Sequence, residues 1–593
     1  MKFPYGVSDF EKLISEGYFY VDRTDRIPLL ESLGDQLIFL RPRRFGKSLL
    51  LTMLENYYDV AKADRFARLF GHLAIGRAPT PLHNQYLVMR WDFSFVRAYG
   101  ASAEITQALH NHVNVQITGF AYRYREILPT HVHIRENDAI ASFESLQMAV
   151  QQSPYHLYLL IDEYDNFANE VMMSAQSGSR QRYEALLHGE GALKTLFKAI
   201  KGGATGRGVD RVFITGVSPV VLADMTSGYN VARSVSLHPA LLDLCGFIEA
   251  EVAMTLQQVA ADCHFAPDRV AEALAMTRAF YNGYRFGYDA EQPVYNPTLA
   301  LYFLREFQEH CAYPEEMLDS NLAMDRNRLT YVSQLPGGSQ LILDAVAGDP
   351  PVSVDRLADR FGVEDMVRED KEAGFNASLL YYLGVLTLAG RSELDRLRLV
   401  IPNLVVRKLY VERLLELILP DRRDHAAPTQ AAETFYQTGD LQPLCDFIEG
   451  RYFKALDNRD YRRADELIVK VAFLTLLFND RLYIMDSETT VERSYADLTM
   501  IVRPERRHLP IYDFLFEFKF VALAEAKLSG ETARGLRQAD VATLPAVQSQ
   551  IIEARARLES YRPALQSKHQ DRLHLRTYAV VALGFERLVW EEV

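Results

Sequence analysis

In LIFLRPRRFGKS, residues 37–48, a short apolar run leads through a basic loop into a helix-like pattern. Leu37–Leu40 is typical of a buried strand, and Lys47–Tyr58 has the spacing of a helix. A loop at a helix N-terminus points backbone N–H groups at a phosphate, and the helix dipole favours negative charge there. We therefore expect ATP phosphates to bind at Arg44, Phe45, Gly46, Lys47 and Ser48.

The first position of this loop departs from the usual P-loop, because Arg41 stands where a glycine is expected, five residues before Gly46. Such a loop still folds if Arg41 has an ordinary φ. Within it, Lys47 would neutralise the β and γ phosphates, and Ser48 would hold Mg²⁺. Gly-Lys-Ser also arises by chance, so the loop alone leaves an ordinary strand–turn–helix open.

Two further strand ends strengthen the nucleotide hypothesis. The apolar run 157–161 ends in Asp162 and Glu163, of which the first would contact Mg²⁺ and the second would polarise the attacking water. The run 211–214 ends in Thr-Gly-Val-Ser, so Ser218 could sense the γ-phosphate. The alternative for the two acids is a solvated strand end. The loop is followed along the chain first by a strand that ends in two acids and then by a strand that ends in hydroxyl residues. This order favours an ATP-binding P-loop NTPase.

The alternation of apolar runs and helical patterns in the first half is typical of an α/β fold with a parallel sheet. A chain of 593 residues is too long for one core, so we expect several domains. The predicted order is a P-loop domain over 1–240, a helical lid over 241–335, a winged-helix-like region over 336–415, a helical linker over 416–458 and a C-terminal α/β domain over 459–593.

The C-terminal part carries a second constellation of charged residues. Asp497 begins an apolar run, and Glu517 and Lys519 lie two apart on the next strand-like run, 511–521, so they share one face. A hairpin would bring the three together. Two carboxylates and a lysine suit Mg²⁺-dependent cleavage of a phosphodiester, with Asp497 and Glu517 as metal ligands. Glu466, on a preceding helix, could point into the same site or be an exposed helical glutamate.

The bulk properties indicate an ordinary globular protein of the cytoplasm. No apolar run approaches the roughly 20 residues of a membrane span, and the N-terminus lacks an apolar signal segment. The four cysteines form no Cys-x-x-Cys pair, which argues against structural zinc. The net charge is −13, so nucleic acid would have to bind local basic clusters, namely 41–44, 422–423 and 503–508.

Several further motifs make the chain similar to a known family over nearly its whole length. They include YVDRT (20–24), FITGVSP (213–219), FYNGYRF (280–286), VYNP (294–297) and SYADL (494–498), beside the P-loop, the acidic strand end and Glu-Phe-Lys at 517–519. With them the chain resembles bacterial AAA-ATPase-like proteins that carry a C-terminal PD-(D/E)XK nuclease domain. In that family RPRRFGKS is the usual form of the P-loop.

The resemblance implies a restriction-endonuclease-like α/β fold for 459–593 and a catalytic group of Glu466, Asp497, Glu517 and Lys519. It also implies ATP and Mg²⁺ as cofactors, and nucleic acid, DNA in preference to RNA, as the partner. One departure is that Val469-Lys470 stands where relatives often have Tyr-His. By analogy alone the resemblance also suggests a role in defence against, or maintenance of, mobile genetic elements. A homo-oligomer is a further expectation.

Three functions fit the sequence. The first is an ATP-controlled, Mg²⁺-dependent nuclease. The second is a regulatory NTPase whose nuclease-like domain only binds nucleic acid or protein. The third is a nuclease with a degenerate nucleotide site, for which Arg41 is the motivation.

Overall fold

The structure of the chain is a computed structural model. It describes residues 1–593 except 167–190, 220–230, 319–325, 349, 359–360, 362–372, 422–424, 458–465, 487–488, 492–493 and 570–571. The described residues divide into two compact units, each made of several segments of the chain. Unit 1 comprises Met1–Phe265, Asn282–Glu309 and Ser353–Leu399, and unit 2 comprises Ala266–Tyr281, His310–Val352 and Val400–Val593.

Unit 1 is built on a five-stranded parallel sheet in the order β2-β3-β4-β1-β5. The central strands are buried, as expected of apolar runs covered on both faces. Because β4 lies between β1 and β3, the carboxyl ends of these three strands meet at one sheet edge. The strands are β1 (Gln36–Leu40), β2 (Tyr86–Asp92), β3 (His156–Asp162), β4 (Val209–Gly216) and β5 (Arg233–Ser234).

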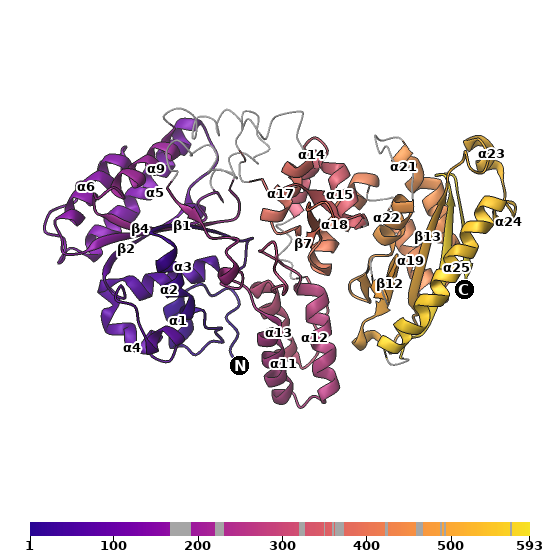
Figure 1. Cartoon of the computed structure of the whole chain (residues 1–593), viewed down its shortest axis with the longest axis horizontal. Coiled ribbons are helices and arrows are strands. Elements are labelled where there is room, and N and C mark those ends of the chain that lie inside the picture. The colour runs from indigo at the N-terminus through magenta and orange to yellow at the C-terminus, as the bar shows by residue number, and fades with distance from the viewer. Residues whose placement is uncertain are drawn as a thin grey trace. The chain divides into compact units, whose positions relative to one another are not determined.

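Helices cover both faces of this sheet, as Figure 1 shows. One face carries α5 (Ser102–Arg123), α6 (Ala139–Gln151) and α9 (Ala192–Gly203), and the other carries α1 (Phe10–Ser15), α2 (Ile27–Leu33), α3 (Lys47–Tyr58) and α4 (Phe66–Phe70). Unit 1 also includes α11 (Glu249–Asp262), α13 (Pro297–His310), α17 (Ala373–Tyr382) and a small sheet of β6 (Val352–Val354), β7 (Thr387–Arg391) and β8 (Leu397–Val400).

Unit 2 is built on a mixed five-stranded sheet in the order β15-β14-β13-β12-β9. Its central strand β13 pairs parallel with β14 and antiparallel with β12. These strands are β9 (Tyr483–Asp486), β12 (Leu498–Val502), β13 (Asp513–Val521), β14 (Leu575–Leu583) and β15 (Arg587–Glu592). A separate antiparallel pair joins β10 (Thr489–Val491) to β11 (Ser494–Ala496).

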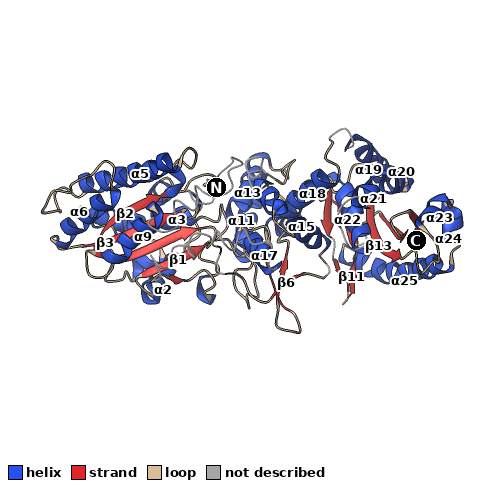
Figure 2. Cartoon of the chain, turned by 90° about the horizontal axis from the view of Figure 1, so that it is seen from above, coloured by secondary structure: helices blue, strands red, loops and turns tan. Residues whose placement is uncertain are grey.

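Both faces of this second sheet are also covered by helices (Figure 2). Phe435 of α19 (Ala426–Thr438) and Phe473 of α22 (Glu466–Leu477) pack on the aromatic face of β13, against Phe516. The opposite face is covered by α25 (Pro545–Lys568). Unit 2 also contains α12 (Pro267–Tyr281), α14 (Arg326–Gln334), α15 (Gly338–Ala347), α18 (Leu404–Ile418), α20 (Gln442–Phe447), α21 (Phe453–Asp457), α23 (Gly530–Gly535) and α24 (Gln538–Ala542).

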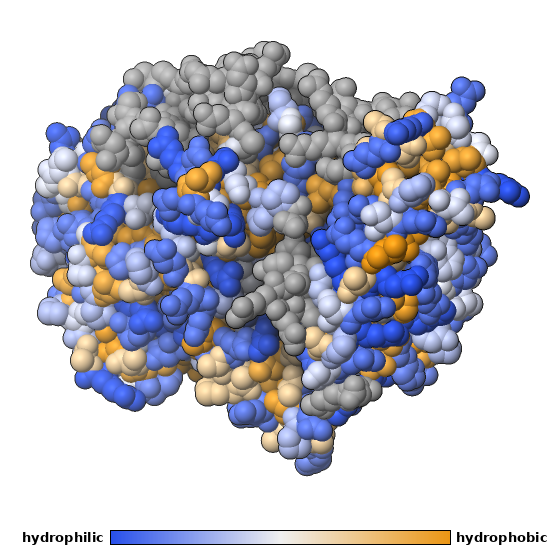
Figure 3. All heavy atoms as spheres, turned by 45° about the vertical axis from the view of Figure 1, so that its right-hand side comes forward, coloured by the Kyte–Doolittle hydropathy of each residue, from blue (hydrophilic) through white to orange (hydrophobic). Residues whose placement is uncertain are grey.

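The α/β fold with a parallel sheet is therefore confirmed for the first part of the chain. The predicted domain boundaries stay a prediction; residues 353–399, inside the winged-helix-like region, group with the P-loop sheet. None of the helices that the structure describes is long and apolar enough to cross a membrane. On the face in Figure 3, hydrophobic residues lie in small groups among hydrophilic ones.

Candidate nucleotide and carboxylate sites

The P-loop lies between β1 and α3, as its sequence predicts. Gly46 precedes the first helical residue with a φ of 89°, and Arg44 has a φ of 67°. Both values lie in the left-handed region, which costs a non-glycine residue some strain and turns the chain tightly. The loop therefore wraps closely around the start of α3.

Arg41 has an ordinary φ and is buried. Its guanidinium donates hydrogen bonds to the carbonyl oxygens of Leu40, Ser236, Leu241 and Leu242, and it lies 4.1 Å from the ring centre of Phe286. Burial lowers the pKa of Arg41 to about 10. Arg41 is thus a packing residue beneath the loop. The prediction that the basic cluster 41–44 attracts nucleic acid is therefore wrong for Arg41.

Phe45 is also buried, with its ring 5.0 Å from that of Tyr284 and 5.2 Å from that of Phe286. Only the backbone of Phe45 can therefore face a phosphate. The Oγ1 of Thr298 donates to the carbonyl oxygen of Arg44 at 2.9 Å, so a distant helix start also supports the loop. The FYNGYRF motif thus has a packing role beside the P-loop.

Lys47 and the acidic end of β3 meet at the sheet edge. The Nζ of Lys47 lies 3.3 Å from the Oε1 of Glu163 and donates to the carbonyl oxygen of Pro42 at the same distance. Asp162 is buried, and its Oδ1 accepts from the Oγ1 of Thr215 at 2.7 Å. Burial raises the pKa of Asp162, while the hydroxyls of Ser48 and Thr215 oppose the shift.

The second carboxylate oxygen of Asp162, Oδ2, is buried and accepts no hydrogen bond from the residues that the structure describes. An orphaned buried carboxylate oxygen is costly unless a cation or donor binds it. Together with the Ser48 hydroxyl, it supplies the hard oxygen ligands that Mg²⁺ prefers. The residues present therefore fit Mg²⁺ at this place.

Ser218 follows β4, and its predicted role as a γ-phosphate sensor stays a prediction. It is buried, and its backbone N–H and Oγ both donate to the Oδ2 of Asp165, at 2.8 and 2.9 Å. The Oδ1 of Asp165 accepts from the backbone N–H of Val217 at 3.0 Å. Asp165, which the sequence analysis did not single out, thereby ties the ends of β3 and β4 together. From β4, the hydroxyl that reaches Asp162 is that of Thr215.

A cavity of about 290 Å³ opens on the P-loop. Its walls are mostly apolar and come from the N-terminal segment, from 19–21 and from 244–247. Such a volume with apolar walls beside phosphate-binding groups suits a nucleoside. The predicted residues that line it are Arg44, Phe45, Gly46, Lys47, Ser48 and Glu163, whereas Asp162 and Ser218 do not.

In unit 2 the structure brings all four predicted charged residues together. The Nζ of Lys519 lies 3.1 Å from the Oε1 of Glu517 and 3.2 Å from the Oε1 of Glu466. The Oδ2 of Asp497 accepts the backbone N–H of Phe518 at 2.8 Å, which places Asp497 beside the same strand. Glu517 and Lys519 are buried, while Glu466 is partly exposed.

The electrostatics of this carboxylate site follow from its burial. Burial raises the pKa of Glu517 to about 7, helped by the charge of Asp497 and opposed by Lys519. The Oε2 of Glu517 is buried without a hydrogen-bond partner among the described residues, so it too fits a cation. Burial lowers the pKa of Lys519, but its carboxylate neighbours, Glu517 first, outweigh this and raise it.

One charged group at this site was missed by the sequence analysis. The Nη1 of Arg557, on α25, lies 2.9 Å from the Oε1 of Glu517. The two residues are 40 positions apart, and no local pattern marks Arg557. Lys470, the lysine at the position where the resemblance predicts a histidine, is buried in α22.

In the basic cluster 503–508, Arg503 is also buried, and its guanidinium donates hydrogen bonds to the carbonyl oxygens of Asp480 and Pro314. It therefore does not present its charge to nucleic acid, against the expectation from sequence. The cluster 422–423 lies outside the described residues.

Residues 4–226 match the family described as predicted AAA-ATPases. This range contains the P-loop, the acidic end of β3 and the end of β4, so the similarity to that family includes the candidate nucleotide site. A protein of Azotobacter chroococcum mcd 1, known as an uncharacterized protein in the vnfD 5' region, is 25% identical over 561 residues, covering 88% of this chain and 90% of its own length.

Three solved structures are similar at a lower sequence identity. The ORC1 protein of Aeropyrum pernix in complex with DNA is 13% identical, with a TM-score of 0.24, and covers 64% of this chain and 86% of its own. Cdc6p of Pyrobaculum aerophilum (12%, 0.25) and the ORC2 protein of A. pernix in ADPNP–ADP complexes (13%, 0.28) each cover 68% of this chain and 98% of their own. TM-scores this low support no argument about function.

Proposed function

We propose that the chain binds and hydrolyses ATP in unit 1 and cleaves nucleic acid, DNA in preference to RNA, in unit 2, with ATP controlling the cleavage. The observation that carries the ATPase part is the ion pair between Lys47 and Glu163, both of which line a nucleoside-sized cavity. The buried, unpartnered Oδ2 of Asp162, at the end of the same strand, adds to it. The match of residues 4–226 to predicted AAA-ATPases supports it.

In the ATPase site, the backbone of the P-loop would cradle the phosphates and Lys47 would neutralise the terminal ones. Ser48 and Asp162 would hold Mg²⁺, which when bound offsets the charge of the phosphates. Lys47 would have to leave Glu163 to reach the phosphate, and this frees the carboxylate to orient the attacking water.

In the carboxylate site, Asp497 and Glu517 would hold Mg²⁺, which when bound acidifies a water molecule for attack on the phosphodiester. Lys519 would orient that water or stabilise the negative charge on the phosphoryl oxygens. Glu466 completes the set from the start of α22 by fixing Lys519. The support for this proposal is the convergence of the four side chains and the buried, unpartnered Oε2 of Glu517.

A titration of ATP and Mg²⁺ into the full chain tests the nucleotide site. Wild type should bind with micromolar affinity, and Lys47→Ala should bind at least tenfold more weakly because it removes the phosphate charge partner. Glu163→Gln should keep its affinity and lose turnover. Equal binding by wild type and Lys47→Ala would contradict the assignment.

The second candidate function is a regulatory NTPase whose unit 2 binds nucleic acid without cutting it. One observation favours it: two cations, Lys519 and Arg557, already occupy the Oε1 of Glu517. In that case ATP is hydrolysed, nucleic acid binds, and no strand is cut under any metal condition.

A further inference from the structure

Arg557 connects the surface of α25 to the buried end of the carboxylate site. Its Nη1 lies 2.9 Å from Glu517, and its Nη2 lies 3.0 Å from Glu553, one helical turn before it. Glu517 is fully buried, whereas the side chain of Arg557 is 46% exposed. The guanidinium therefore bridges a buried acid and a partly exposed one, while nearly half of the Arg557 side chain is exposed.

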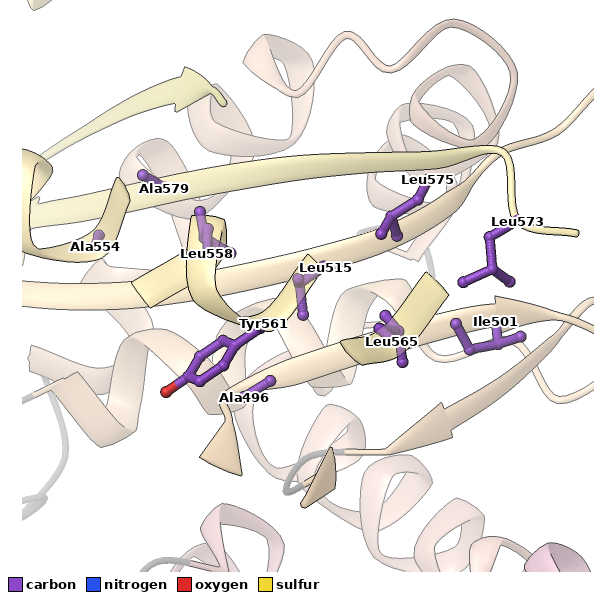
Figure 4. Close-up of a cluster of buried hydrophobic side chains, with 10 residues drawn as sticks. All are labelled: Ala496, Ile501, Leu515, Ala554, Leu558, Tyr561, Leu565, Leu573, Leu575 and Ala579. Carbon is purple, nitrogen blue, oxygen red and sulfur yellow. The ribbon is translucent and has the colours of Figure 1, made fainter. Parts of the chain in front are cut away.

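The backbone of α25 is held in place beneath Arg557 by a hydrophobic cluster. Ala554, Leu558, Tyr561 and Leu565 recur at helical spacing and pack on the sheet against Leu515, as Figure 4 shows. The helix is therefore a rigid support beside the acids. Arg557 does not belong to this cluster and its long side chain is partly exposed, so it can change partner while the helix keeps its place.

The charges around Glu517 create a competition. Three carboxylates, Glu466, Asp497 and Glu517, face two cations, Lys519 and Arg557. A divalent ion held by Asp497 and Glu517 would supply the charge that Arg557 now supplies. It would also repel the guanidinium, which at 46% exposure can turn outward while its backbone stays in place.

We propose that Arg557 is the phosphate contact of this site: it neutralises Glu517 until a divalent cation binds, and then turns to a backbone phosphate of the nucleic acid. The proposal rests on the proposed nuclease function. A guanidinium suits the task because it stays charged and donates two parallel hydrogen bonds to phosphate oxygens. The outward turn couples metal loading to substrate binding.

The chain offers a matched control in Arg555, two residues earlier on α25. Its side chain is 45% exposed and pairs with Glu591 of β15, two strands from Glu517 in the sheet. Replacement of either arginine by alanine removes one charge from the same helix. A difference between the two variants therefore reports the position of Arg557 and not the net charge.

Two titrations on the full chain test the proposal. Isothermal calorimetry with Mg²⁺ should show several-fold tighter binding for Arg557→Ala than for Arg555→Ala, because a competitor for Glu517 is gone. Fluorescence anisotropy with a labelled 20-base-pair duplex in Ca²⁺ should show binding weakened by roughly tenfold, with the salt slope reduced by about 0.9. Arg557→Lys should recover part of the duplex affinity.

The inference is overturned if Arg557→Ala and Arg555→Ala behave alike, or if Arg557→Ala weakens Mg²⁺ binding, which would make Arg557 a structural brace. A wild-type chain that binds Mg²⁺ and duplex normally in that experiment leaves the nuclease proposal standing. If the wild-type chain neither binds nor cuts the duplex, the nuclease proposal itself is contradicted.

Discussion

At the scale of single residues, Asp165 joins the ends of the two strands that frame the nucleotide site. It is fully buried, and its carboxylate accepts three hydrogen bonds from Val217 and Ser218. Burial raises its pKa, and the N–H donors of Val217 and Ser218 oppose that shift. Because Thr215 on the same strand donates a hydrogen bond to Asp162, any movement of the β4 end would also move this proposed metal ligand.

We therefore expect Asp165→Asn to lower the turnover of ATP by about tenfold or more while nucleotide affinity changes little. The amide sets an N–H group against an N–H donor, which displaces the β4 end. Steady-state hydrolysis and a nucleotide titration measure the two effects separately. The control is Asp210→Asn, an exposed position at the opposite end of β4. Unchanged turnover in Asp165→Asn would refute this role.

Arg41 gives a second prediction at this scale. Arg41→Gly restores the residue usual at this loop position, yet it removes several hydrogen bonds and a buried cation–ring contact. We expect a loss of about 2–4 kcal/mol in the free energy of unfolding and no gain in ATP affinity. Thermal denaturation and a nucleotide titration test it. Tighter ATP binding by the glycine variant would instead support a degenerate site.

At the scale of elements, α25 carries Arg557 and is itself held by the cluster in Figure 4. Leu558→Ala should destabilise unit 2 by about 2–5 kcal/mol, since it leaves a cavity at a fully buried position. Ile552→Ala on the same helix is the control, because Ile552 is 66% exposed. Chemical denaturation compares them. Equal stability of the two variants would show that α25 is not anchored here.

The sequence predicted those parts of the sites that local patterns determine. Periodicity two placed Glu517 and Lys519 on one face of β13, and the strand–loop–helix pattern located Lys47 and Ser48. Asp165 and Arg557 were missed because their partners lie about 40 to 50 residues away and depend on which strands become neighbours. The prediction that basic clusters attract nucleic acid was wrong for Arg41 and Arg503 for the same reason, because tertiary packing decides whether an arginine is buried.

At the scale of the whole molecule, the account combines an ATPase-like unit with a carboxylate site in one chain of net charge −13. Such a charge repels nucleic acid at long range, so binding must depend on local cations and on salt. We expect duplex affinity to fall steeply between 50 and about 200 mM salt. Anisotropy across this range measures it, and a flat salt dependence would argue against phosphate contacts.

The most direct test of the central claim is cleavage of linear, nicked and single-stranded DNA with Mg²⁺, with and without ATP. Wild type is compared with Lys519→Ala and Lys47→Ala. The account predicts cutting by wild type, none by Lys519→Ala, and a changed ATP response in Lys47→Ala. Absence of cutting by wild type under every condition, with ATP hydrolysis intact, would contradict it and favour the regulatory NTPase.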